Sequence, residues 1–293
     1  MLRGHCMEIV SREAHRRLPQ TSYGEVRTSF GARAVRRSAA GACAARQAHR
    51  ESRPPGSMIR MSELRPALRP LAQDIWVVER PQRFYGLEVG TRMTVIRLAD
   101  GSLLLHSPVA LDAELRRALD AIGRVRFAVA PNRVHHLYAG RVADAYPEAR
   151  LWVGPGLEHK RPDLAFDGVL GDEAPAEWKG QVDQVFFRGR PYENEVVFFH
   201  RASRTLILCD LAFNFGPRAA APTRLLMRLL RSYGRFGPSK LDPLLIRDRR
   251  AARQSLERIL GWDFDRVVVA HGDVLASGGR EALRQGYSWL LAA

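Results

Sequence analysis

The chain is poor in cysteine and has no long apolar run. Its three cysteines, Cys6, Cys43 and Cys209, lie far apart and form no CxxC pair. Cys209 ends a strand-like apolar run, where a buried, reduced thiol is typical, so we expect a reducing compartment and a cytoplasmic protein. No apolar run approaches the roughly 20 residues that a membrane-spanning helix needs, so we expect no integral membrane protein.

The sequence also offers no nucleophile with its base. No serine lies in a G-x-S-x-G turn, and Cys209 has the context of a core residue. These absences argue against covalent catalysis by serine or cysteine.

Acidic residues are few for a chain of 293 residues, and the formal net charge is +15. Residues 1–57 carry eleven arginines, no lysine and four glutamates, which gives 11 − 4 = +7. The other +8 is scattered without interleaved aromatic residues or a reader motif, so we expect no specific nucleic-acid binding.

The basic N-terminal segment differs in composition and hydrophobic pattern from the rest of the chain. It has little hydrophobic periodicity and ends in a Pro-Pro-Gly-Ser cluster, so we predict a disordered extension over residues 1–61 and a folded domain over residues 62–293. Two further interpretations are a transit peptide and an upstream extension from a misassigned start, since Met58 and Met61 directly precede the domain.

Residues 127–140, FAVAPNRVHHLYAG, combine a short apolar strand, a Pro-Asn break and two adjacent histidines that open a predicted helix. At such a turn His135 and His136 can converge on one point. The alternative is structural, with His135 capping the helix and His136 packing beneath it.

The remaining pattern predicts alternating strands and helices. A β-meander begins near Asp74, and Ser107-Pro108 has the signature of a helix start. The expected later elements are a helix over 136–146, strands over 151–153, 185–187, 195–201 and 205–208, helices from 222 to 235 and from Asp248 to Gly261, a strand over 266–270 and a helix over 281–291.

Three separate strand ends thus carry His135-His136, Asp210 and His271. Neutral imidazoles and a carboxylate are ligands of zinc, iron and manganese. Their shared position at strand ends predicts a metal site, because the loops that leave buried strands are exposed while their bases stay rigid.

In this order of elements the chain resembles the metallo-β-lactamase superfamily over residues 72–293. The resemblance rests on an early β-meander, a histidine motif opening a helix, a hairpin that ends in aspartate, and a strand that ends in His-Gly. It implies an α/β (α+β) fold, a four-layer αββα sandwich with metals at one edge, and hydrolysis of thioesters, lactams or phosphodiesters.

The chain departs from that family's H-x-H-x-D-H signature. Pro131 and Arg133 stand at the first two histidine positions, and Arg190 stands where a further histidine is usual. The resemblance therefore implies loss of a first metal and retention of a second, held by His135, His136, Asp210 and His271. One divalent ion, zinc first and iron or manganese next, is expected; the competing outcome is an arginine paired with Asp210 and no metal.

The resulting hypothesis is a mono-metal hydrolase for a small anionic ester, thioester or phosphodiester. Asp210 would act catalytically, as a ligand or by orienting water, and Arg133 and Arg190 would bind the substrate's anionic group. The alternative is a metal-free, non-catalytic binding or scaffold protein of the same fold. Separately, the basic helix 222–235 could be a lid or a contact with a partner, a second copy or an anionic membrane, or an ordinary solvated surface helix.

Overall fold

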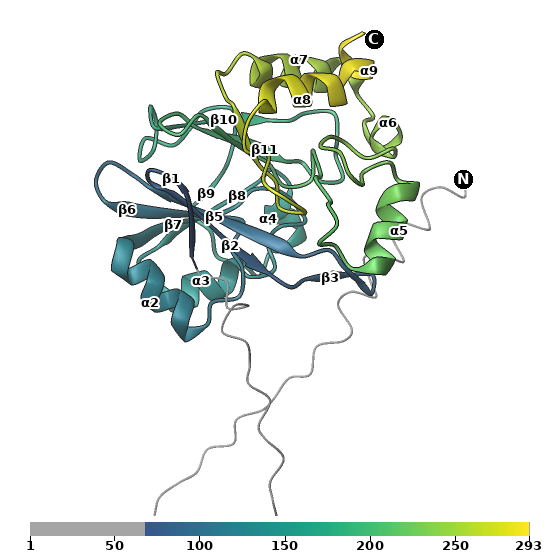
Figure 1. Cartoon of the computed structure of the whole chain (residues 1–293). Helices are drawn as coiled ribbons and strands as arrows, with labels where there is room; N and C mark the ends of the chain where they lie inside the picture. The colour runs from purple at the N-terminus through teal and green to yellow at the C-terminus, as the bar shows by residue number, and fades with distance from the viewer. Residues whose placement is uncertain (1–67, 293) are drawn as a thin grey trace, which may run out of the picture. The chain divides into compact units, whose positions relative to one another are not determined.

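Two β-sheets form the centre of the structure, a computed structural model that describes residues 68–292 (Figure 1). The predicted disordered extension of residues 1–61 lies outside the described residues. None of the described helices combines the length and apolarity needed to cross a bilayer.

The first sheet has seven strands in the order β1-β2-β5-β6-β7-β8-β9. Its first four strands are antiparallel, and its last four, starting from β6, are parallel. The strands are β1 (Arg69–Ala72), β2 (Ile75–Arg80), β5 (Thr91–Arg97), β6 (Ser102–His106), β7 (Arg124–Ala130), β8 (Arg150–Val153) and β9 (Gly168–Val169). A small hairpin, β3 (Arg83–Phe84) with β4 (Leu87–Glu88), extends from the connection between β2 and β5.

The second sheet has four strands in the order β10-β11-β12-β13. Its bounds are β10 (Val182–Phe186), β11 (Val196–His200), β12 (Thr205–Ile207) and β13 (Arg266–Val268). The first three strands are antiparallel, whereas β13 joins β12 in parallel. Parallel neighbouring strands therefore occur in both sheets. Because parallel strands end at the same edge of their sheet, the loops that follow them start from that edge.

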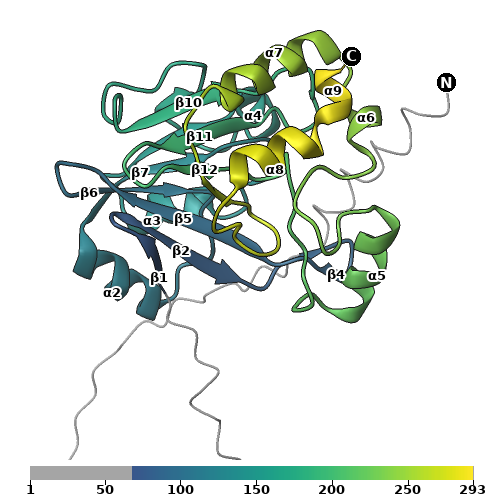
Figure 2. The same ribbon diagram turned by 45° about the horizontal axis from the view of Figure 1, so that its top comes forward.

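Three apolar layers hold the sheets and helices together. Helices α2 (Ala113–Ile122) and α3 (Ala139–Ala145) cover the outer face of the first sheet, where Leu115, Leu119 and Val142 are buried. Helices α7 (Arg249–Leu260), α8 (Gly279–Gly286) and α9 (Ser288–Leu291) cover the second sheet (Figure 2). Phe127, Phe198 and Trp178 belong to the layer between the sheets.

This arrangement is the predicted αββα sandwich. Strand β7 illustrates its origin, because Phe127 and Val129 face the inter-sheet layer while Ala128 and Ala130 face the helices. That alternation follows from the two-residue period of a strand with both faces buried.

Local signals predicted some boundaries and missed others. The helix capped by Asp248 is confirmed: it spans Arg249–Leu260, and the Asp248 side chain accepts from the Ala251 N–H. The predicted helix start at Ser107-Pro108 is wrong, because α2 begins at Ala113 and Asp112 caps it. The helix expected over 136–146 begins only at Ala139.

The remaining helices lie in connections. They are α4 (Leu157–Lys160), α5 (Ala221–Leu229) and α6 (Asp242–Leu245). Helix α5 is shorter than the predicted span 222–235, since a turn follows Leu230 and Arg231 has a φ of 55°.

Candidate metal centre

The turn after β7 sets the direction of His135. Pro131 ends the strand, and the Asn132 side-chain oxygen accepts from the N–H groups of Val134 at 2.8 Å and His135 at 2.7 Å. An asparagine that bonds its own following backbone in this way fixes a tight turn. The turn is also tied to the second sheet, because the Val196 N–H donates to the Pro131 carbonyl at 2.9 Å.

Asp210 and His271 come from loops that leave the second sheet. Asp210 follows β12, and its N–H donates to Glu195 Oε2 at 2.6 Å, while the preceding N–H of Cys209 donates to Glu195 Oε1 at 2.7 Å. His271 follows β13 and precedes Gly272, whose φ of 90° and close approach to the Asn214 backbone leave no room for a side chain. Both loops are thus held rigidly at their bases.

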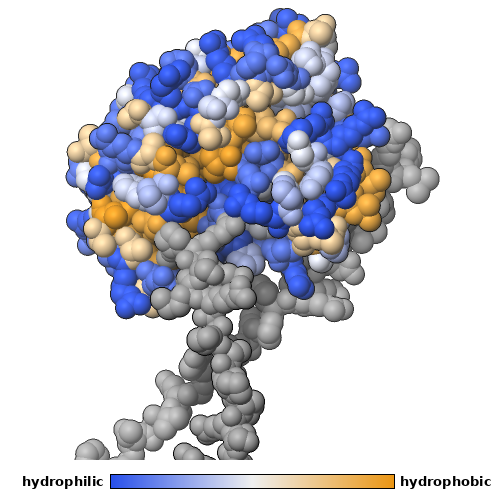
Figure 3. All heavy atoms as spheres, viewed as in Figure 1, coloured by the Kyte–Doolittle hydropathy of each residue, from blue (hydrophilic) through white to orange (hydrophobic). Residues whose placement is uncertain are grey.

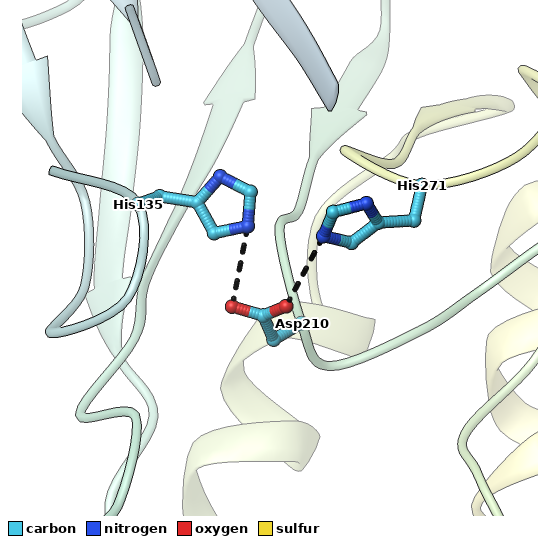
Figure 4. Close-up of side chains that lie close together, drawn as sticks. All are labelled: His135, Asp210 and His271. Carbon is cyan, nitrogen blue, oxygen red and sulfur yellow. Dashed lines mark ion pairs between the residues drawn. The ribbon is translucent and has the colours of Figure 1, made fainter. Parts of the chain in front are cut away.

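These loops bring His135, Asp210 and His271 to one point, and Figure 4 shows both imidazoles directed at the two carboxylate oxygens. His135 Nε2 lies 3.4 Å from Asp210 Oδ2, and His271 Nε2 lies 3.6 Å from Asp210 Oδ1. One ligand atom from each residue lies within 4.8 Å of the others. We call these three residues the ligand group.

The outer nitrogen of each imidazole already has a partner. His271 Nδ1 lies 2.8 Å from the Gly90 carbonyl oxygen, which can only accept, so Nδ1 carries the proton and a neutral His271 presents a lone pair at Nε2. His135 Nδ1 lies 2.8 Å from Ser107 Oγ. Partners of this kind orient metal-ligating histidines and fix their tautomer.

The carboxylate of the ligand group is also oriented from behind. Asn132 Nδ2 donates to Asp210 Oδ2 at 2.8 Å, so the residue that shapes the His135 turn also holds the acid. On the other side, the Arg92 guanidinium donates to the carbonyls of Val269 and Gly272, which flank His271. Glu79 Oε1 in turn accepts from Arg92 Nη2 at 2.9 Å.

The ligand group lies in an acid-rich interior. Burial opposes ionisation of Asp210, but the nearby His135 and His271 hold the pKa of its carboxyl well below the ordinary range. Burial and the Asp210 charge raise the pKa of Glu195 to about 7. The pKa of His135 is raised although burial lowers it, because Asp210 and Glu195 favour its cation. The surroundings therefore favour positive charge at this point.

Arg190 lies in this interior but faces away from solvent, with a side chain only 3 % exposed. It donates to the Asp210 backbone carbonyl at 2.8 Å and lies 3.0 Å from Glu193 and 3.5 Å from Asp242. The expectation that it offers a fork to a substrate therefore does not match its position. The expected pairing with Asp210 takes place at the backbone and leaves both carboxylate oxygens facing the histidines.

His136 is not part of the ligand group, although it was predicted as a metal ligand. Its Nδ1 lies 3.1 Å from Arg161 Nη1, and burial together with the Lys160 and Arg161 charges lowers its pKa to about 4. The reason is local, because the turn that starts at Asn132 sends consecutive side chains in different directions. Arg133 lies on the same side of the turn as these two cations, with Nη1 donating to the Pro191 carbonyl at 2.8 Å. We call this side the cationic side of the turn.

Several supporting residues were not predicted from the sequence. Ser107 carries a helix-start signature, yet it has a φ of 54° and contacts His135. Glu195 and Arg92 lie inside strand-like runs, and a charged residue in such a run was the only available signal of a buried charge. The Gly90 carbonyl has no sequence signal at all.

Comparison with known proteins identifies one family. A family model described as a domain of unknown function (DUF4336) matches residues 72–227, which include His135 and Asp210 but not His271. No curated protein matches the chain.

Solved structures with a similar fold are metallo-β-lactamases and a flavodiiron core. The DIM-1 metallo-β-lactamase exposed to ceftazidime is 14% identical, with a TM-score of 0.53 over 76% of this chain and 96% of that one. The mono-zinc form of FIM-1 from Pseudomonas aeruginosa is 9% identical, with a TM-score of 0.52 over 77% and 92%. The Flv1 flavodiiron core from Synechocystis sp. PCC6803 is 13% identical, with a TM-score of 0.55 over 76% and 60%.

These identities establish the fold and nothing finer. The structure has the metallo-β-lactamase fold, and its ligand group lies where loops from both sheets meet. Two imidazoles and a carboxylate with their outer atoms already bonded form a donor set that suits one divalent ion.

Proposed function

The chain belongs to the family described as a domain of unknown function (DUF4336), and from its metallo-β-lactamase fold and its ligand group we propose that it is a mono-metal hydrolase. The proposed substrate is a small anionic ester, thioester or phosphodiester. Zinc is the proposed ion, and iron or manganese accept the same donors.

The observation that carries the proposal is the direction of the donor atoms. His135 Nε2 and His271 Nε2 face the Asp210 carboxylate. Their Nδ1 atoms are hydrogen-bonded elsewhere, that of His135 to Ser107 Oγ and that of His271 to the Gly90 carbonyl. Three protein ligands are the usual number in catalytic zinc sites, because the fourth position then stays open to water or substrate. The first metal's expected positions are filled by Pro131, Arg133 and Arg190, so one ion fits the chain better than two.

A bound ion would supply Lewis acidity, which polarises an ester-like or phosphoryl group. It would also lower the pKa of water, so that a hydroxide nucleophile is available near neutral pH. His135, Asp210 and His271 would hold the ion, and Asp210 would also orient the attacking water. Asn132 and Arg92 would keep these side chains in place, since Asn132 bonds the Asp210 carboxylate and Arg92 bonds the backbone on both sides of His271.

The preference for an anionic substrate is supported by the cationic side of the turn. Within residues 68–292, no carboxylate pairs with Arg133, and its Nε is buried without a hydrogen-bond partner. Lys160 Nζ donates to the Arg133 carbonyl at 2.7 Å, and burial with the Arg133 and Arg161 charges lowers the pKa of Lys160. Cations crowded in this way are stabilised by a bound phosphate or carboxylate.

The test compares adjacent histidines. Metal analysis of purified wild type is expected to give about one divalent ion per chain, and His135→Ala is expected to lose it. His136→Ala is the matched control, because it alters the neighbouring residue but removes no proposed donor. Equal metal loss in both variants, or none in His135→Ala, would contradict the proposed ligands.

A metal-free scaffold is the second candidate, favoured by one feature. Asp210 already lies within ion-pair distance of both histidines, so the three side chains can form ion pairs with one another, without a metal, when the imidazoles are protonated. Wild-type protein without stoichiometric zinc, iron or manganese, and with unchanged thermal unfolding in chelator, would favour this candidate over the hydrolase.

A further inference from the structure

The segment between Asp210 and Asp242 has an unusual charge composition. Residues 211–241 contain six cationic side chains and no acidic one. They are Arg218, Arg224, Arg228, Arg231, Arg235 and Lys240. Helix α5 forms the centre of this segment, and Figure 1 shows it at the edge of the molecule, away from α2 and α3.

The same segment exposes large apolar side chains. Leu225 and Leu229, one turn apart on α5, are 61% and 67% exposed. In the space-filling view, orange atoms bordered by blue ones lie at the right-hand edge, where α5 is found in Figure 1 (Figure 3). We call Leu225, Arg228, Leu229, Arg231 and Arg235 the basic leucine surface.

These leucines are not needed to attach α5 to the fold. The helix uses its other face, where Thr223 and Met227 are buried and Thr223 Oγ1 donates to the Glu88 carbonyl at 2.7 Å. A helix that packs through one face ordinarily presents polar residues on the opposite face. Here the opposite face carries leucine and arginine, which suits a partner with both apolar and anionic character.

The charges of the basic leucine surface are not neutralised within the described structure. Of the six cations in residues 211–241, only Arg218 lies within ion-pair distance of an acid, Asp273, among residues 68–292. Arg228 instead lies over the Tyr233 ring at 4.5 Å from its centroid. The surface therefore keeps a net positive charge beside exposed leucines.

An aromatic hairpin contacts α5 on its buried face. Hairpin β3–β4 contacts α5 through the Thr223–Glu88 hydrogen bond, and its Phe84 and Tyr85 are 48% and 59% exposed. Aromatic side chains are favoured at the boundary between lipid headgroups and acyl chains. Exposed leucine, arginine and aromatic residues on one helix and the hairpin that contacts it have the composition of segments that lie in that boundary.

We propose that the basic leucine surface, together with the β3–β4 hairpin that contacts α5, docks the protein on an anionic lipid bilayer. The arginines would contact negatively charged headgroups while Leu225 and Leu229 enter the headgroup–acyl boundary. A lipid surface fits better than nucleic acid, because nucleic acid offers no apolar partner for leucines that alternate with the arginines. The interaction does not require the metal and is independent of the proposed hydrolysis.

Vesicle co-sedimentation tests the proposal with the full chain. Wild type is expected to bind phosphatidylserine–phosphatidylcholine vesicles, to bind pure phosphatidylcholine vesicles much more weakly, and to be released by high salt. Arg228→Glu with Arg231→Glu is expected to weaken binding at least twenty-fold, since each arginine near an anionic surface contributes roughly fivefold. Leu225→Ser with Leu229→Ser is expected to weaken binding while leaving the charge unchanged.

The matched control reverses two exposed arginines elsewhere, Arg117 on α2 and Arg141 on α3, with the same change in net charge. Arg117→Glu with Arg141→Glu is expected to bind nearly as wild type, and circular dichroism is expected to show that all variants are folded. The proposal is overturned if folded wild type binds no vesicles. It is also overturned if the control loses as much binding as the α5 variant, or if the α5 variant retains full binding through the basic N-terminal segment.

Discussion

Two buried charged regions meet at Asp210, and they differ in whether their donor atoms are free to bind a metal ion. The ligand group directs two imidazole nitrogens and a carboxylate toward one point. The second region, which we call the arginine network, consists of Arg190, Glu193, Asp242 and Tyr287. There each charge faces an opposite charge or a hydroxyl group, so no set of donor atoms converges on a further ion.

The contrast shows that burial and charge do not by themselves define a metal site. Asp242 is fully buried, and burial raises its pKa although Arg190, Ser239 and Tyr287 favour its anion. Asp210 is also buried, yet its carboxylate faces imidazole nitrogens that can give up a proton to bind an ion. The direction of free lone pairs, which the outer hydrogen bonds determine, is what separates the two regions.

Breaking the arginine network is expected to have the largest effect. Arg190→Met should lower the free energy of unfolding by about 3–5 kcal/mol, because it leaves Glu193 and Asp242 buried without their cation. Urea unfolding measures this loss, and the milder Asp242→Asn should cost less. A stability within about 1 kcal/mol of wild type for Arg190→Met would show that the network is not structural.

Metal binding sharpens the comparison from the other side. At free metal about a hundred times Kd, wild type should gain roughly 2.7 kcal/mol of stability, and its thermal midpoint should rise by about 5–10 °C. His271→Ala should show no such rise, since it lacks one of the three donors. Differential scanning calorimetry with and without metal provides the measurement, and an equal rise in both proteins would point to binding elsewhere.

Removal of an outer partner should have a smaller effect. Ser107→Ala leaves the three donors in place but removes the hydroxyl that contacts His135 Nδ1. Metal affinity should fall by about 10–100-fold, as is typical for such partners. Competitive titration with a chromophoric chelator gives the Kd, and an unchanged Kd would mean that His135 needs no such support.

The smallest effect is expected at an ion pair outside both regions. Although burial opposes it, the Arg92 and Arg69 charges lower the pKa of Glu79 from 4.5 to about 2. Because the folded value lies below the unfolded one, the pair stabilises the protein above pH 4.5, and this stabilisation disappears as the pH falls toward 2. After a discount for its partial exposure, Glu79→Gln should cost about 1–2 kcal/mol at neutral pH.

Urea unfolding of Glu79→Gln at several pH values checks the sign. The unfolding free energies of wild type and variant should approach each other as the pH falls through 2, because below that pH Glu79 is protonated in both the folded and the unfolded chain. A gap that stayed constant down to that pH would mean that packing, rather than charge, explains the loss.

Much of the fold was predictable because its signals are local. The buried stripe of α7 and its Asp248 cap are visible within a dozen residues, and the predicted helix forms there. The alternation along β7 and the breaks at strand ends likewise depend on near neighbours. These signals, together with the order of elements, were sufficient for the αββα sandwich.

The candidate site was only partly predictable, because its details depend on distant contacts. Asp210 and His271 were identifiable from their strand ends, but the choice between His135 and His136 depends on a turn that Asn132 shapes. The part played by Arg190 depends on Asp242, which is 52 residues later in the chain. No local pattern could indicate that Ser107 contacts His135 rather than capping a helix.

The ligand group also joins segments that are remote along the backbone. His135 follows a strand of the first sheet, whereas Asp210 and His271 follow strands of the second, and successive members are separated by 75 and 61 positions in the chain. An ion held by all three would close two long loops and restrict the unfolded chain much as a covalent cross-link does. Its release would weaken the contact between the two sheets at the edge that carries the ligand group. Backbone amides along that edge would then exchange with deuterium faster, while those in the helix-covered faces would stay protected.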